Sequence, residues 1–414
     1  MKESAFLMTP HRPKDIVIIL LLGALSVVTP FAVDMYLPAF SHIARDFGTT
    51  TSIVSFSLST YFIGFGLGQI LYGPLLDRFG RKCPLYFGLV LYILASIGCG
   101  TAHGIHSFIA LRFLQAIGGC AAQVASIAMV RDFFPAKESA RIFSLLFLMI
   151  GVSPLLAPTV GSALMSALSW HWIFFLLGLT ATAILLAVFF LLPEGHTPDH
   201  TVSLMPKPIL TVFFAIVRRP QFLTYALAGA FSFAGLFAYV AGSPIIFMDG
   251  FHLSTRAFGM VFATLTGGFI GGSQINVILL RRISSRQIFL YALSAQVLLG
   301  AIFFAGVQTH LFGFAATLVM FFLFLSCIGL TYPNAAAIAL GPFTKETGSA
   351  SALLGFLQMG VGSLVSTGIG LLGVAAIVSL IAGSALCSLL ILLVGKRHIS
   401  SLVIRDENEV PVLH

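Results

Sequence analysis

Two charged residues of this sequence, Asp34 and Arg112, lie inside otherwise apolar runs. A charge within a bilayer costs roughly 2.5–3.5 kcal/mol on insertion scales, so each residue is a candidate for function. Helix rise places both about 9 Å below the same membrane boundary. They could form a buried salt bridge that only fixes helix packing. Alternatively, Asp34 is a carboxylate that gains and loses a proton when substrate binds or the conformation changes.

The composition excludes a soluble protein and indicates an integral membrane protein. Of the 414 residues 58% are hydrophobic and 9% are charged, and the mean hydropathy is +1.02. A soluble domain has about 25% charged residues. The net charge of +8 is spread over short clusters between apolar runs, which does not indicate nucleic-acid binding. The five cysteines lack metal-ligand spacing, so neither a metal site nor a disulfide framework is expected.

Polar residues divide the chain into twelve apolar runs that are long enough to cross a membrane as helices. These predicted spans are 16–40, 53–76, 84–102, 106–129, 140–167, 171–192, 222–247, 257–280, 286–306, 311–338, 349–372 and 374–395. The predicted fold is therefore all-α and membrane-embedded. One side of the spans, called the basic face below, receives 19 of the 22 Lys and Arg residues. By the positive-inside rule we expect this face, with both termini, to be cytoplasmic.

The chain is expected to form two six-helix halves. A proline-rich linker without hydrophobic period, 193–220, separates an N-terminal bundle (1–192) from a C-terminal bundle (221–395), which a tail (396–414) follows. Weak repeats support this division. FLMIGVS at 147–153 resembles FLQMGVG at 356–362.

A second repeat relates the loops that follow the second span of each half. Gly68, Gly73 and Arg78 correspond to Gly271, Asn276 and Arg281, but Leu280 stands where the first copy has Asp77. The second copy therefore keeps its positive charge without that carboxylate. We expect a symmetric architecture with asymmetric chemistry.

Polar and aromatic residues within the spans could line a cavity between the halves, and each could equally form an interhelical hydrogen bond. The candidates are Tyr36, Tyr61, Gln115, Gln123, Tyr239, Gln274, Asn276, Asn334 and Gln358. The fifth span concentrates helix breakers, which predicts a kinked or sliding contact. These are Gly151, Pro154, Pro158 and Gly161. No catalytic motif or ATP-binding loop is found, so we expect neither an enzyme nor ATP-driven transport.

Four segments resemble motifs of twelve-helix major facilitator superfamily transporters, specifically the drug:proton antiporters of the bicyclomycin-resistance and chloramphenicol-efflux (Bcr/CflA) family. DMYLPA at 34–39 resembles the first-helix motif, and LSTYFIGFGLGQILYGPLLDRFGRK at 58–82 resembles the second helix with the loop signature. LRFLQAIGG at 111–119 resembles the fourth-helix motif. SPLLAPTVGS at 153–162 resembles the antiporter motif of helix five, with Ala157 and Ser162 in place of glycines.

The resemblance implies a proton-coupled exporter of small, mostly hydrophobic compounds that works by alternating access. Asp34 would exchange protons and substrate, and Arg112 would tune it. The proton gradient would replace any cofactor, and a monomer in a bacterial inner membrane is expected. Export of one endogenous metabolite, such as an amino-acid derivative or siderophore, and proton-coupled uptake remain alternatives. A membrane receptor or channel is a further one.

The resemblance also implies a cytoplasmic gate at the loop signature. Its members would be Gly73, Asp77, Arg78, Gly80, Arg81 and Lys82, together with Asp132 after the fourth span. In the family pattern, Asp77 meets the N-terminus of helix eleven, where the helix dipole favours a negative charge. Arg81 would pair with Asp132. These contacts would hold the cytoplasmic side closed in the outward-facing state.

Overall fold

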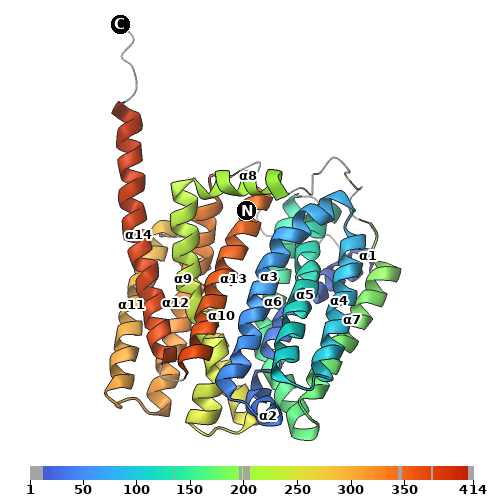
Figure 1. Ribbon diagram of the computed structural model, residues 1–414. Coiled ribbons are helices and arrows are strands. Elements are labelled where there is room, and N and C mark those ends of the chain that lie inside the picture. The colour runs from blue at the N-terminus through green and yellow to red at the C-terminus, as the bar shows by residue number, and fades with distance from the viewer. Residues whose placement is uncertain are drawn as a thin grey trace, which may run out of the picture.

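The protein is built from long helices that run side by side in two bundles (Figure 1). The computed structural model describes residues 13–134, 136–194, 198, 206–343, 347–373 and 376–408, and these residues contain no strand. Twelve of the helical stretches are long and apolar enough to cross a membrane. The predicted all-α fold with twelve spans is confirmed. Most of the predicted span ends differ from the observed helix ends by a few residues.

The first half contains the helices up to the proline-rich linker. They are α1 (Pro13–Asp34), η1 (Leu37–Ala39), α2 (Phe40–Asp46), α3 (Thr51–Arg78), α4 (Lys82–Gly100), α5 (Ile105–Phe133), α6 (Ala136–Ala167) and α7 (His171–Leu191). The second half follows α8 (Pro206–Val217). It contains α9 (Pro220–Pro244), η2 (Ile245–Gly250), α10 (Thr255–Leu279), α11 (Ser285–Gln308), α12 (Phe314–Leu340), α13 (Thr347–Leu372) and α14 (Ile377–Asn408).

The apolar run at 16–40 predicted a single helix, but the structure has three consecutive helical segments there. Helix α1 ends at Asp34, and the chain continues as the short 3₁₀-helix η1 and then α2. Pro38 explains the break, because it has no N–H to donate to the carbonyl of Asp34 and it disfavours the α conformation at Leu37. The break leaves Asp34 at a helix end within the membrane.

The linker between the halves is partly helical. The prediction of a segment without hydrophobic period is wrong for α8. Every residue of this helix from Ile209 to Val217 except Thr211 is apolar. Pro206 and Pro208 fall in the first turn of α8, where a missing N–H removes no helical hydrogen bond. In Figure 1, α8 lies across one end of the bundle, the end at which α14 also continues beyond its neighbours.

The two halves pack through equivalent helices. Helix α3, the second span of the first half, packs along α13, the fifth span of the second. The reverse pair, α6 and α10, packs in the same way. The outward surfaces expose large apolar side chains such as Phe190 (74%) and Leu311 (76%), which is the surface that a lipid environment requires. The predicted repeat thus corresponds to a symmetric interface.

Close packing of α4 on α5 gives a stability prediction. A Cβ at Gly118 would lie 2.5 Å from the backbone N of Tyr92 and 2.6 Å from the backbone O of Gly88. Backbone atoms cannot move aside without separating the helices, so Gly118→Ala should destabilise the fold by about 1–3 kcal/mol. The control Gly383→Ala, which meets nothing within 4 Å, should leave stability unchanged or slightly raised. Thermal unfolding in detergent measures both, and equal midpoints would contradict the prediction.

Candidate functional site

Asp34 lies at the broken end of α1, between the two halves. The residue is 5% exposed, and among the described residues its side chain forms neither a hydrogen bond nor an ion pair. The chain directly after it, η1, packs against α9 of the second half, the helix that carries Tyr239. The hydroxyl of Tyr239 is itself buried without a hydrogen-bond partner among these residues. The acid at the end of α1 and the hydroxyl of Tyr239 on α9 are thus both buried without partners among the described residues.

Arg112 of α5 is fully buried beside this site, and aromatic rings cover its guanidinium group. Its Cζ atom lies 4.2 Å from the ring centroid of Tyr36 and 4.4 Å from that of Tyr61. Nη2 donates to the backbone oxygen of Ala32 at 3.0 Å, and Nη1 donates to Oε1 of Gln115. The oxygen of Ala32 belongs to the last turn of α1, where the helix dipole is negative. The positive charge is therefore compensated by a helix end and two π-faces.

The structure does not contain the salt bridge that was one of the two alternatives for the intramembrane charges. Arg112 and Asp34 form no ion pair within 4.0 Å, although both residues are described. Arg112 instead reaches the backbone two residues before Asp34. The carboxylate is therefore left without a neutralising partner, which argues against the interpretation of a packing salt bridge.

A group of buried hydroxyls surrounds Arg112. Among the described residues, Oγ1 of Thr29 and the hydroxyls of Tyr61 and Tyr92 have no hydrogen-bond partner, nor has Nε of Arg112. Two of these atoms lie near Gly119, where a Cβ would lie 3.1 Å from Oγ1 of Thr29 and 3.4 Å from the hydroxyl of Tyr61. Buried polar atoms are rarely left unpaired, so these positions suit a polar guest such as water.

The remaining cavity candidates are only partly brought together. Tyr36, which donates to or accepts from Ser57 at 2.8 Å, and Gln115 belong to the Arg112 cluster. Asn334 donates to Asn276 at 2.6 Å, so these two form an interhelical hydrogen bond. Gln358 is buried beside Tyr332, Gln123 is half-buried, and Gln274 is exposed.

The predicted antiporter motif lies where α6 meets both the broken helix and the second half. Helix α6 runs through Pro154 and Pro158 without interruption. A Cβ at Gly161 would overlap the backbone carbonyl of Met35, so glycine is required for this approach to the chain after Asp34. At Gly151, by contrast, a Cβ would meet nothing within 4 Å. Gly161 and Gly151 therefore have different roles.

Polar contacts join the halves at the end opposite the basic face. Asp249, in η2, accepts hydrogen bonds from Ser41 at 3.0 Å and from Thr51 at 2.8 Å. Ser162 of α6 donates to the backbone oxygen of Thr255 at 3.0 Å. Sequence reasoning did not single out Asp249, although no other acidic residue lies between 200 and 345. Ser162 replaces a family glycine, and the structure shows what its hydroxyl contacts.

Arg81 organises the loop between α3 and α4. Its Nε donates to Asp132 at 2.7 Å, its Nη2 reaches the same carboxylate at 3.4 Å, and its Nη1 contacts Asp77 at 2.7 Å. The implied pair of Arg81 and Asp132 is thus present. Burial lowers the pKa of Arg81, but the hydrogen bonds and charges of the two carboxylates outweigh it and raise the pKa above its ordinary value. The guanidinium group stays charged at every physiological pH.

Asp77 and the other loop residues are only partly placed. The side chain of Asp77 is 52% exposed and pairs with Arg81. Among the described residues it forms no hydrogen bond with the start of α13, the N-terminus of helix eleven that it was expected to meet. A Cβ at Gly73 would meet nothing within 4 Å. The guanidinium group of Arg78 lies 5.9 Å from the ring of Phe79.

Glu194, after α7, is a loop partner that sequence reasoning missed. Its Oε1 accepts the backbone N–H groups of Arg81 at 2.6 Å and Lys82 at 3.2 Å, which caps the start of α4. Lys82 in return donates from Nζ to the backbone oxygen of Leu192, at the end of α7, at 2.7 Å. Each helix end therefore receives a charge opposite to its dipole. The available signal was an acidic residue directly after a span that ends on the basic face.

Comparison with known proteins agrees with this architecture. The sequence profile of the Major Facilitator Superfamily matches residues 22–367. The chain belongs to this superfamily of transporters. It is therefore a multi-pass membrane protein that moves a small molecule.

Two curated relatives are similar over nearly the whole chain. The uncharacterized MFS-type transporter YdgK of Bacillus subtilis is 31% identical over 370 residues, which cover 87% of this chain and 90% of that protein. The bicyclomycin resistance protein homolog of Haemophilus influenzae is 29% identical over 357 residues, covering 86% and 89%. The resemblance to the bicyclomycin-resistance branch is thereby confirmed. A crystal structure of a D-xylose-proton symporter shares the fold, with a TM-score of 0.72, 14% identity and coverage of 91% and 97%.

The loop geometry predicts unequal effects at two glycines of the signature. Gly80 has φ +79°, and a Cβ there would lie 3.1 Å from Oε1 of Glu194. Gly80→Ala should therefore lower the free energy of unfolding by about 1–2 kcal/mol through the left-handed backbone alone. Gly73→Ala, in the open part of α3, should not lower it. Thermal unfolding of the purified variants tests this difference, which a similar loss at both positions would contradict.

Proposed function

We propose that the protein is a proton-coupled exporter of small, largely apolar compounds and that Asp34 carries the coupled proton. The observation that carries this proposal is the buried carboxylate at the broken end of α1, which forms no ion pair with any described residue. A carboxylate in such a place is costly when charged, so it takes up a proton readily or binds a cationic substrate instead. Competition between proton and substrate for one carboxylate is sufficient for antiport.

The position of Asp34 between the halves supports its role in alternating access. The segment directly after it, η1, packs against α9 and α10 of the second half, so movement of one half against the other changes the surroundings of the carboxylate. Gly161 holds the chain after Asp34 against α6, and α6 packs on α10 of the second half. A change of charge at Asp34 can therefore shift the chain after it, and through α6 the interface between the halves.

The name of the Haemophilus relative favours an antibiotic-like substrate over an endogenous metabolite. The antiporter motif around Pro158 and Gly161 favours export over uptake. The basic face is the cytoplasmic one, with both chain ends on it, in the inner membrane of a bacterium. One chain holds both halves and hence the whole site, so a monomer is sufficient.

Neutralising Asp34 tests the proposal directly. Asp34→Asn keeps the size of the side chain but cannot release a proton, so it should abolish efflux driven by a proton gradient in vesicles. Asp15→Asn, an acidic residue at the opposite end of α1, is the matched control and should retain efflux. Membrane levels of both variants are measured alongside. Gradient-driven efflux by Asp34→Asn at the wild-type rate would refute the proposed role.

The loop network gives a second test. We propose that Asp77 and Asp132 hold Arg81 so that the basic face closes during the cycle. Asp77→Asn removes one of the two charges that Arg81 contacts, and it should lower transport severalfold while protein levels stay normal. Asp77→Glu keeps the charge and should recover part of the activity. Wild-type turnover in Asp77→Asn would contradict a gate at this loop.

A further inference from the structure

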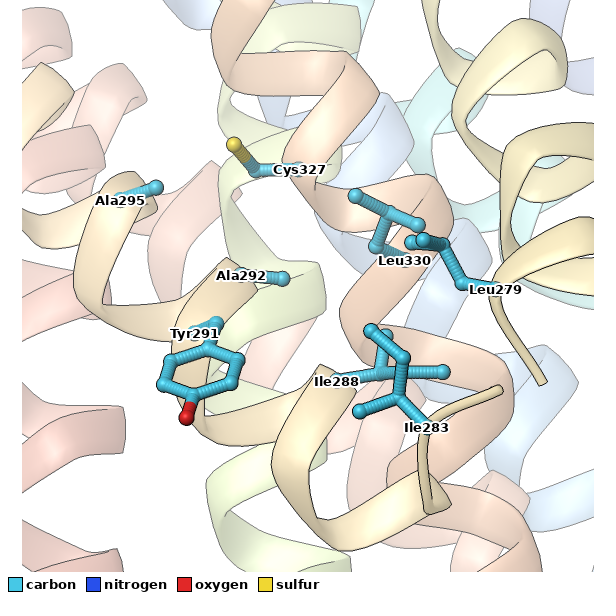
Figure 2. Close-up of a pocket in the computed structure, with 8 residues that line it drawn as sticks. All are labelled: Leu279, Ile283, Ile288, Tyr291, Ala292, Ala295, Cys327 and Leu330. Atoms are coloured by element: carbon cyan, nitrogen blue, oxygen red, sulfur yellow. The ribbon is translucent and has the colours of Figure 1, made fainter.

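An apolar groove opens on the second half, next to the basic face. It has a volume of about 250 Å³ and lies between α10, α11 and α12. Figure 2 shows Leu279 of α10 and Leu330 of α12 meeting on one side, and Tyr291 of α11 on the other with its hydroxyl pointing away from them. The lining consists of Leu279, Ile283, Ile288, Tyr291, Ala292, Ala295, Cys327 and Leu330. Such a lining suits a hydrocarbon chain better than a polar molecule.

Three arginines are close in sequence to the residues that line this groove. Arg281 and Arg282 lie in the turn between α10 and α11, and Arg286 lies in the first turn of α11. All three are exposed. Each is within two residues of a groove-lining residue, Leu279, Ile283 or Ile288. The turn is held by Ser284 and Gln287, which form a capping box at the start of α11.

These arginines have no acidic partner in their own half of the chain that the structure describes. None of the ion pairs there involves them, and the sequence from 250 to 345 contains neither Asp nor Glu. The equivalent loop of the first half is neutralised internally, by Asp77 and Asp132 on Arg81. Here Leu280 occupies the position that corresponds to Asp77. No described residue therefore neutralises the positive charge of this loop, which is exposed to an external anion.

We propose that the groove and its three arginines bind an anionic phospholipid. The phosphate contacts the guanidinium groups of Arg281, Arg282 and Arg286, and an acyl chain fills the groove below them. Arginine matches the geometry of a phosphate, and the N-terminus of α11 in the same turn adds a favourable dipole. The three arginines lie at the adjoining ends of two apolar spans, α10 and α11, and the ends of spans are where a bilayer has its headgroups. Basic pockets between spans on the cytoplasmic side are typical sites for anionic headgroups.

Native mass spectrometry of the delipidated full-length protein tests this site. Phosphatidylglycerol and phosphatidylethanolamine with the same acyl chains are added separately, and the retained lipid is counted. We expect wild type to retain phosphatidylglycerol in preference. The variant R281Q/R282Q/R286Q should lose this retention by about tenfold or more, as expected for three charges near a phosphate. Equal retention of phosphatidylglycerol by this variant and wild type would overturn the proposal.

Two further variants separate the site from general charge attraction. R218Q/R219Q removes two exposed arginines of the same face that line no part of the groove, and it should retain phosphatidylglycerol as wild type does. Ala295→Trp fills the groove from an exposed position without changing any charge, and it should lower retention severalfold. An equal loss in R218Q/R219Q would overturn the proposal, because any positive charge would then serve. Unchanged retention in Ala295→Trp would also overturn it, because the groove would have no part in binding.

Discussion

Charge in a low-dielectric interior must be compensated, and the way Arg112 is compensated shapes the first half. The guanidinium group donates hydrogen bonds to a backbone oxygen of α1 and to an amide oxygen, and it lies over two aromatic rings. It forms no ion pair with the carboxylate of Asp34. This solution depends on the end of α1, because only the last turn of a helix has carbonyl groups free to accept a side chain. Had Arg112 formed a salt bridge with Asp34, the carboxylate would be held charged and proton exchange would be harder.

The same break in α1 connects the site to the contacts between the halves. The chain after Asp34 passes so close to α6 that only glycine fits at position 161. One residue further, Ser162 reaches across to the start of α10. Asp249 joins the halves at the same end of the molecule through two hydroxyl donors. The carboxylate of Asp34 is thus connected through Gly161 and Ser162 of α6 to the second half.

The two halves repeat a helix arrangement but treat the charge of their loops differently. In the first half, three carboxylates serve one loop: Asp77 and Asp132 hold the side chain of Arg81, and Glu194 holds its backbone. In the second half, the corresponding loop has three arginines and no carboxylate nearby in the sequence. Since the backbone architecture is shared, this difference comes from side chains alone. One loop is therefore suited to internal switching and the other to an external anion.

The sequence by itself determined the twelve spans and identified Asp34 and Arg112 as charged residues within them, because apolar run length and isolated charge are local properties. It also indicated the pair of Arg81 and Asp132 through a family motif. Only the tertiary structure decided that Arg112 turns to Ala32, that Asn276 and Asn334 bind each other, and that Glu194 caps α4. Those outcomes depend on which helix faces meet and at what depth. Arg112, for example, could pair with the carboxylate of Asp34 or with the backbone oxygen of Ala32, and the packing of α5 on α1 selects Ala32.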